Sequence, residues 1–376
     1  MISNQEKQRI GKAYQDRKPI RVPVSLGVNC RVVILDPRWN PEGISWREYH
    51  DDGRVMVEMQ RRFMDCQADY LNRYCDGPTG RPAEWTFHVD NQNVYDAAYF
   101  GSPVHFRDGQ VPDATPILAG SDRDRLFDFD LDHPLDNPYV QECLRRHERL
   151  TDAVAKTSID GVKLAVAPLL MGWDGPLTIA TQLRGEEIYS DLIEDPDYAM
   201  RLMRFLQRAV EIRNRALAAK AGVPIFASPS GGFADDSIQL ISLDMYRELL
   251  LPLHREWYAL FGGGPHSIHL CGDATRHFPT IHRELNVCSF DTGFPVDHGK
   301  LRRELGPDVE ILGGPEVGLL LTGSPQQVFD RTREILQSGI MKGGRFILRE
   351  ANNLPPAVPE ANLEAMYTCC LEHGNY

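Results

Sequence analysis

The chain has 376 residues, of which 42% are hydrophobic and 25% are charged, a composition typical of a globular protein that buries a large core. Its formal net charge is −12, from 53 acidic and 41 basic residues, and no basic tract stands out in the sequence. This charge argues against nucleic acid and anionic membrane surfaces as partners.

The N-terminal segment and the cysteines bear on the cellular compartment. Residues 1–18 are polar and mixed in charge, and the longest apolar run, residues 164–173, is too short to span a bilayer. The eight cysteines do not follow the paired spacing of a disulfide framework. We therefore expect a cytoplasmic protein whose cysteines are thiols, available for metal or redox chemistry.

Short β-rich runs alternate with helical periodicity along the chain. In chain order, the predicted strands span residues 22–29, 68–72, 162–168, 225–228, 266–271, 287–291, 309–313 and 345–350. The clearest amphipathic helices are predicted at residues 198–220, 243–261 and 325–338. Eight strands that alternate with helices favour the α/β class and a single closed (β/α)₈ barrel of the TIM type. A doubly wound sheet is the competing topology, because both folds have this alternation.

Residues 77–140 interrupt the alternation. They hold Pro, Gly, Asp and aromatic residues in short runs, such as Asp128-Phe129-Asp130-Leu131-Asp132. We interpret this segment as a long βα insertion in the N-terminal half that covers the mouth of the barrel. The chain is then one domain that spans residues 1–376.

The most informative motif is His269-Leu270-Cys271-Gly272, at the end of a predicted strand. Side chains alternate faces along a strand, so His269 and Cys271 point the same way. An imidazole and a thiol on one face form half of a soft-metal site, and zinc is the metal that this pair favours. The other interpretation is a barrel strand with a buried cysteine and a hydrogen-bonded histidine. His277 and His282, on the next predicted helix, are expected at the surface.

Polar residues follow the other predicted strands, and active-site residues of a barrel come from the carboxyl ends of its strands. A catalytic zinc site has three protein ligands, and Glu350 is a stronger third ligand than Asn352 because it is anionic. We therefore predict a metal site of His269, Cys271 and Glu350. The same argument predicts catalytic roles for Asp235, Asp236 and Asp291, and substrate contacts for Asn29, Arg31 and Asn352.

Several motifs over residues 140–372 occur in the order and spacing of a known superfamily. They are Gly175-Pro176-Leu177-Thr178, Ile241-Ser242-Leu243-Asp244-Met245-Tyr246, His269-Leu270-Cys271-Gly272, Leu312-Gly313-Gly314-Pro315 and Leu354-Pro355-Pro356-Ala357-Val358-Pro359. On these motifs the chain resembles the uroporphyrinogen decarboxylase superfamily, especially its zinc-dependent, corrinoid-linked methyltransferase branch. The resemblance implies a single barrel.

The sequence also departs from that superfamily at two places. The decarboxylase has an arginine-rich motif after its first strand, and only Arg31 remains here, so porphyrinogen decarboxylation is not expected. The methyltransferase branch has a third zinc-binding cysteine before the Pro-Pro segment, and Asn352 stands at that position. Either Glu350 replaces the missing thiolate, or metal binding is weak or absent.

The resemblance implies a methyltransferase or demethylase that moves a methyl group between a small substrate and a separate corrinoid protein. Zinc would act as a Lewis acid on the substrate heteroatom. The chain holds no Asp-x-His-x-x-Gly motif, so the corrinoid is expected from the partner. One alternative is a metal-independent decarboxylase or lyase that uses Asp235, Asp236 and Arg31, and another is a non-catalytic ligand-binding barrel. Metal content separates the first interpretation from the other two.

Overall fold

The computed structural model describes residues 2–376, which form two compact units. The first unit comprises the segment up to residue 43 with residues 59–83 and 265–376, and the second comprises residues 44–58 and 84–264. Helix α4 (Gly53–Asp69) runs from the second unit into the first.

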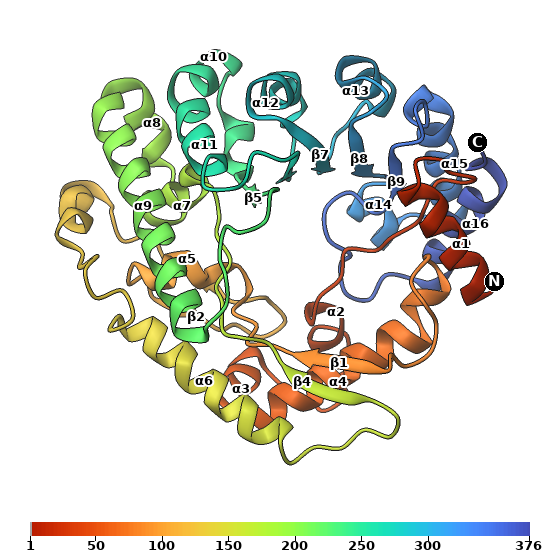
Figure 1. The fold of residues 1–376 in the computed structure, drawn as a ribbon, viewed down its shortest axis with the longest axis horizontal. Helices are drawn as coiled ribbons and strands as arrows, with labels where there is room; N and C mark the ends of the chain where they lie inside the picture. The colour runs from red at the N-terminus through yellow and green to blue at the C-terminus, as the bar shows by residue number, and fades with distance from the viewer. Residues whose placement is uncertain (1) are drawn as a thin grey trace. The chain divides into compact units, whose positions relative to one another are not determined.

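A parallel sheet organises the first unit, and its strands are neighbours in chain order (Figure 1). These strands are β6 (His266–Leu270), β7 (Val287–Thr292), β8 (Glu310–Gly313) and β9 (Phe346–Leu348). Beyond β9, Val24 forms a parallel bridge with Leu348, so the N-terminal segment extends the sheet. All the carboxyl ends in this sheet therefore lie along one edge.

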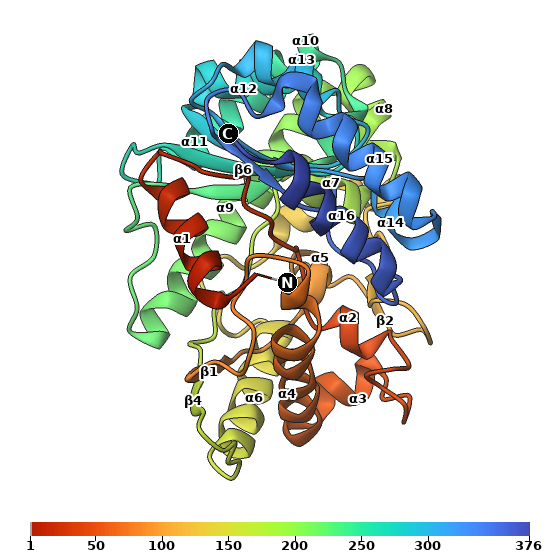
Figure 2. The same cartoon turned by 90° about the vertical axis from the view of Figure 1, so that its right-hand side faces the viewer.

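Helices connect the strands of the first unit, as parallel pairing requires, and further helices precede and follow the sheet. They are α1 (Asn4–Gln15), α2 (Arg31–Ile34), η1 (Leu71–Arg73), η6 (Thr275–His277), α12 (Phe278–Leu285), α13 (His298–Leu305), α14 (Val317–Thr322), α15 (Pro325–Ile335), η7 (Leu336–Ile340) and α16 (Glu360–His373). Helices α15 and α16 lie side by side (Figure 2). Ile268, Phe290, Ile311 and Phe346 are almost fully buried in the sheet, so this unit has a core of its own.

The second unit has short strands and longer helices. Strand β1 (Glu84–Phe87) pairs in parallel with β4 (Lys163–Val166), and β2 (Val104–His105) pairs antiparallel with β3 (Asp113–Ala114). Strand β5 (Gly232–Ala234) is bridged in parallel to Asp174. The helices are α3 (Trp46–Asp51), η2 (Gln92–Val94), α5 (Tyr95–Tyr99), η3 (Gly120–Asp128), α6 (Pro138–Val154), α7 (Pro176–Arg184), α8 (Glu187–Glu194), α9 (Pro196–Ala221), η4 (Asp236–Leu240), α10 (Leu243–Met245), η5 (Tyr246–Leu250) and α11 (Leu251–Tyr258).

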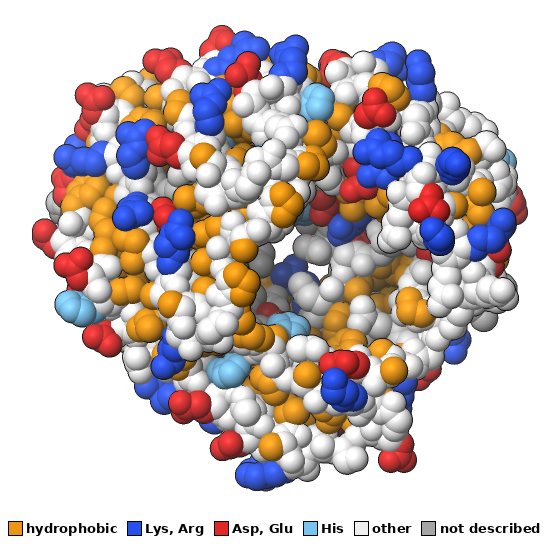
Figure 3. All heavy atoms as spheres, viewed as in Figure 1, with side chains coloured by type: hydrophobic (Ala, Val, Ile, Leu, Met, Phe, Trp, Pro, Cys, Tyr) orange, Lys and Arg blue, Asp and Glu red, His pale blue; other side chains and the backbone are white. Residues whose placement is uncertain are grey.

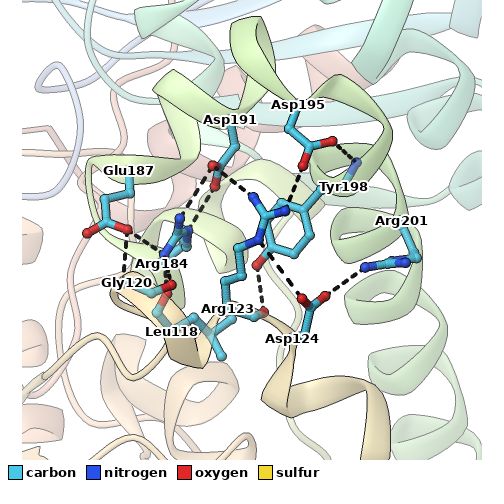
Figure 4. A network of polar contacts seen from close by, with 10 residues as sticks. All are labelled: Leu118, Gly120, Arg123, Asp124, Arg184, Glu187, Asp191, Asp195, Tyr198 and Arg201. Carbon is cyan, nitrogen blue, oxygen red and sulfur yellow. Dashed lines mark hydrogen bonds and ion pairs between the residues drawn. The ribbon is translucent and has the colours of Figure 1, made fainter.

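A network of ion pairs ties η3 to α7, α8 and α9 (Figure 4). Arg184, at the end of α7, is 6% exposed, and its Nε donates to Asp191 over 2.8 Å. Arg123 of η3 donates to Asp195 over 2.7 Å, and its carbonyl accepts the Tyr198 hydroxyl over 2.6 Å. Because several charges share these contacts, the network fixes a segment that has little apolar surface of its own.

The α/β class is confirmed, and five predicted strands match observed ones. The predicted strands at residues 162–168, 266–271, 287–291, 309–313 and 345–350 correspond to β4 and β6–β9. In the segment predicted as residues 22–29, pairing is limited to a bridge at Val24. The single domain and the closed barrel stay predictions.

Two predicted strands are wrong. Residues 68–72 form the end of α4 and the start of η1, because Ala68 and Leu71 are buried on helical turns. Residues 225–228 are not a strand, since they lie between Pro224 and Pro229 and Phe226 has a left-handed φ of +54°. The segment predicted as an insertion, residues 77–140, contains the strand β1, whose Trp-Thr-Phe sequence suits a strand.

The surface carries charges of both signs. On the face shown in Figure 3, acidic and basic side chains are interspersed. Among residues 2–376, no helix combines the length and the apolar character that crossing a bilayer requires.

Candidate metal centre

Strand β6 brings His269 and Cys271 together at its carboxyl end. His269 Nε2 lies 3.1 Å from Cys271 Sγ, and both side chains are partly exposed. Behind them, a Cβ atom on Gly293 would overlap the backbone of Cys271 and Gly272, so glycine lets the next loop pack against this turn. The convergence predicted from their shared strand face is therefore confirmed.

Asp291 on the neighbouring strand orients His269. The two residues are register partners of β6 and β7, and His269 Nδ1 donates to Asp291 Oδ2 over 2.7 Å. Burial lowers the pKa of His269, but the hydrogen bonds to Asp291 and Cys271 outweigh burial and raise this pKa to about 10. Nδ1 keeps its proton on Asp291, so a metal ion would bind at Nε2 and displace the proton that Nε2 carries when the ring is protonated.

Arg349 links this pair to the last strand of the sheet. Its side chain is 11% exposed, and its Nη1 donates to Asp291 Oδ2 over 3.0 Å. Its Nη2 donates to Glu350 Oε1 over 3.2 Å and to the Asn352 carbonyl over 2.8 Å. Sequence reasoning missed this residue, although its position after β9, beside Glu350, was a usable signal.

Glu350, the predicted third ligand, has other partners in this structure. It is fully buried, and its Oε1 accepts the Gly27 amide over 2.7 Å as well as Arg349. Burial raises the pKa of Glu350 to about 7, and the Arg349 charge opposes that rise. Within residues 2–376, Glu350 is not grouped with His269 and Cys271 at the spacing of one metal ion. Its carboxylate instead joins the N-terminal segment to the last strand.

Of the three predicted substrate contacts, Asn29 and Asn352 lie in loops of the first unit, and Arg31 is the first residue of α2. Asn29 Oδ1 accepts the Arg31 amide over 3.0 Å at the start of α2. Asn352 has a left-handed φ of +87°, and its carbonyl accepts Arg349. Their roles toward a substrate stay predictions.

Asp235 in the second unit has its own partners. Its Oδ2 lies 2.8 Å from His254 Nε2, and its Oδ1 accepts the Thr178 amide over 2.7 Å. It is fully buried, and a Cβ atom on Gly175 would overlap it. Asp235 therefore holds the start of α7, while its neighbour Asp236 is partly exposed at the start of η4.

Asp174, which lies just before α7, is a further carboxylate of the second unit. Tyr95 donates to its Oδ1 over 3.2 Å and Gln182 to its Oδ2 over 3.1 Å. Burial raises the pKa of Asp174 to about 8, helped by the negative charges of Asp96 and Asp236. Burial therefore favours the protonated form of Asp174.

The remaining histidines and cysteines of this region are not grouped with the pair. His277 is fully buried, so the prediction that it lies at the surface is wrong. His282 is half-buried, and its Nδ1 lies 2.7 Å from the Val287 carbonyl. Cys288 is the second residue of β7, so it lies at the opposite end of that strand from Asp291.

The donor atoms of His269 and Cys271 fit a zinc ion. A tetrahedral zinc with bonds of about 2.3 Å to sulfur and about 2.0 Å to nitrogen separates those atoms by about 3.5 Å. The observed separation of 3.1 Å reaches this value by a small rotation of two partly exposed side chains. Asp291 supplies the carboxylate that zinc-binding histidines commonly contact through the other ring nitrogen.

Comparisons with known proteins identify the family of this chain. The sequence profile described as uroporphyrinogen decarboxylase (URO-D) matches residues 94–373. A methylated-thiol–coenzyme M methyltransferase of Methanosarcina mazei is 34% identical over 218 residues, which are 57% of this chain and 54% of that protein. The chain thus spans about half the length of this curated relative. A solved methyltransferase from M. mazei has a TM-score of 0.64 at 16% identity, with 99% of both chains covered, and it shares the fold.

Proposed function

Because the chain belongs to the uroporphyrinogen decarboxylase family, we propose that it is a methyltransferase that acts on a small thiol or its methyl thioether. The relative whose name specifies methyl transfer between methylated thiols and coenzyme M supports this class of substrate. In the direction of thiol methylation, the S–H proton leaves and an S–CH₃ bond forms. The methyl donor keeps the electron pair of the bond that it breaks.

The single observation that carries the proposal is the contact of His269 Nε2 with Cys271 Sγ, backed by Asp291. A bound zinc would supply Lewis acidity that lowers the pKa of a substrate thiol. His269 and Cys271 would hold the ion through one soft and one borderline donor. Asp291 keeps the imidazole in the orientation that directs Nε2 toward Cys271 Sγ.

A carboxylate is proposed as the third ligand, in place of the thiol that the methyltransferase branch has. Glu350 is the favoured residue because it is anionic and follows β9, the last strand of the sheet in the first unit. An oxygen ligand makes the ion harder than a third thiolate does.

The methyl carrier is proposed to be a corrinoid bound to a separate protein, as in the branch that the sequence resembles. The predicted closed barrel belongs to this proposal, supported by the family and by the strand–helix alternation. In such a barrel the carboxyl ends of the strands present the site to both substrate and partner.

The test uses the purified chain with free methylcobalamin as the methyl donor and with 2-mercaptoethanol or coenzyme M as the acceptor, under anaerobic conditions. The methylated thiol is measured by mass spectrometry. We expect product with the parent protein and with Cys288→Ser, and a loss of at least about 100-fold with Cys271→Ser, since the metal loses a ligand.

Two outcomes contradict the proposal. One is the absence of methylated thiol with every acceptor, and the other is equal activity of Cys271→Ser and the parent protein. Turnover of a carboxylated substrate by metal-free protein would instead support the alternative of a decarboxylase or lyase.

A further inference from the structure

The guanidinium of Arg349 lies between two carboxylates at the carboxyl edge of the sheet in the first unit. One of them, Asp291, is the next-to-last residue of β7 and contacts His269, while the other, Glu350, follows β9. Arg349 thus contacts Asp291, which is the residue that orients the proposed metal ligand His269.

We propose that Arg349 is a positioning residue that fixes the metal-binding orientation of His269 through Asp291. The inference rests on the proposed role of His269 and Cys271 as metal ligands and deepens it. Arg349 itself touches neither of these two residues in the contacts described.

Two residues donate hydrogen bonds to Asp291, and both bonds reach the same carboxylate oxygen. His269 Nδ1 and Arg349 Nη1 donate to Oδ2, while Oδ1 is buried without a hydrogen-bond partner among the described residues. An unpartnered buried oxygen costs free energy. The carboxylate would lower this cost if it rotated so that Oδ1 also accepted a hydrogen bond from the imidazole of His269. The guanidinium of Arg349, which follows β9, opposes this rotation because its hydrogen bond fixes the position of Oδ2.

Arginine suits this position better than lysine does. Its planar fork reaches Asp291 with Nη1 and both Glu350 and the Asn352 carbonyl with Nη2. An ammonium group is a point charge with no fixed fork, so it does not set the direction of two carboxylates at once.

Gly27 provides an independent sign that the chain is arranged around this side chain. A Cβ atom on Gly27 would overlap the Arg349 guanidinium and crowd Glu350 Oε1. Glycine therefore leaves the space that the guanidinium occupies, and its own amide donates to Glu350 over 2.7 Å.

A matched control distinguishes positioning from mere ion pairing. Arg345 lies at the other end of β9, is 16% exposed and donates to Glu310 over 2.6 Å. It resembles Arg349 in burial and charge partner but lies at the opposite end of the strand from Asp291. Its loss perturbs the same strand without changing the orientation of His269.

The experiment measures Co²⁺ affinity, with Co²⁺ as a spectroscopic substitute for zinc. The variants are Arg349→Gln, Arg349→Lys and the control Arg345→Gln, each checked for folding by circular dichroism. The thiolate-to-cobalt absorption reports Cys271, and the d–d bands report coordination geometry. We expect Arg349→Gln to weaken Co²⁺ binding by about 10-fold or more, Arg349→Lys to recover part of it, and Arg345→Gln to bind like the parent protein.

A double variant tests whether Arg349 acts through Asp291. If it does, Arg349→Gln adds less than about a 2-fold loss to that of Asp291→Asn, because the shared contact is already gone. Fully additive losses would overturn the inference, as would equal effects of Arg349→Gln and Arg345→Gln. Should Arg349→Gln fail to fold, the comparison of Arg349→Lys with the parent decides, and unchanged affinity and d–d bands would overturn the inference.

The Co²⁺ measurements distinguish a failure of this inference from a failure of the proposed function. If the parent protein binds no Co²⁺, or if His269→Ala binds it as the parent does, the proposed metal pair fails and the role of Arg349 falls with it. If the parent binds Co²⁺ and His269→Ala does not, while the Arg349 variants bind normally, the positioning role alone is wrong.

Discussion

Asp96→Asn should strongly destabilise the second unit. Asp96 and Arg213 form an ion pair at 2.7 Å, and both side chains are fully buried. Asp96 also accepts the Asp174 amide over 2.9 Å, and Arg213 donates to the Gly172 carbonyl over 2.7 Å. The pair therefore fixes the loop that leads into α7.

The magnitude follows from what the change leaves behind. An asparagine has one acceptor oxygen, so its amide NH₂ must face either Arg213 Nη1 or the Asp174 amide, both of which are donors. The guanidinium stays charged in a buried site because it does not deprotonate. Breaking a buried pair from one side costs about 3–5 kcal/mol, a large part of a total stability of about 5–15 kcal/mol.

The assay is chemical unfolding, followed by circular dichroism. The matched control is Asp124→Asn, which breaks an ion pair of the same 2.7 Å length between side chains that are 58% and 60% exposed. We expect the control to cost less than about 1 kcal/mol. Replacing both members, with Asp96→Leu and Arg213→Met, should recover part of the stability. If Asp96→Asn cost no more than the control, the reasoning about buried charge would be refuted.

Three further results are expected. Arg184→Gln should lower the free energy of unfolding by about 1–3 kcal/mol, because Asp191 loses the charged hydrogen bonds that the buried guanidinium donates. An unchanged unfolding midpoint would contradict this. The pKa of Asp174 is about 8 in the folded protein against 3.8 for a free side chain, so the stability that its proton contributes is present below about pH 4 and is lost as pH rises toward 8. Asp174→Asn should therefore weaken the decline in stability from pH 5 to 8, and a parallel decline in both proteins would contradict the assignment. For the third ligand, Glu350→Gln should reduce bound zinc while Asn352→Ala should not, and the reverse pattern would show that the amide is the ligand.

Local patterns in the sequence predicted the central pair of residues. His269 and Cys271 are two apart in a strand, and strand geometry alone places them on one face. Asp291 was expected at a strand end, but its contact with His269 depends on the register of β6 against β7, which involves residues 22 apart in the chain. The partner of Asp291 on β9, Arg349, is more distant still, so sequence reasoning did not find it.

The failed strand predictions have a local cause as well. The apolar residues at 225–228 suggested a strand, but the flanking prolines remove backbone donors, and β5 forms a few residues later. Glu350 was ranked by charge and strand face, whereas the structure engages its carboxylate with the Gly27 amide and the Arg349 guanidinium. Such competition between partners depends on tertiary contacts that periodicity does not report.

The zinc content of the purified protein tests the central claim most directly. The measurement is elemental analysis of the parent protein and of His269→Ala, Cys271→Ser and the control Cys288→Ser, all after exchange into metal-free buffer. We expect about one zinc per chain in the parent and in Cys288→Ser, and a large loss in the other two variants, because each loses a donor of the proposed site. Absence of zinc from the parent after reconstitution, or full retention in both His269→Ala and Cys271→Ser, would contradict the claim.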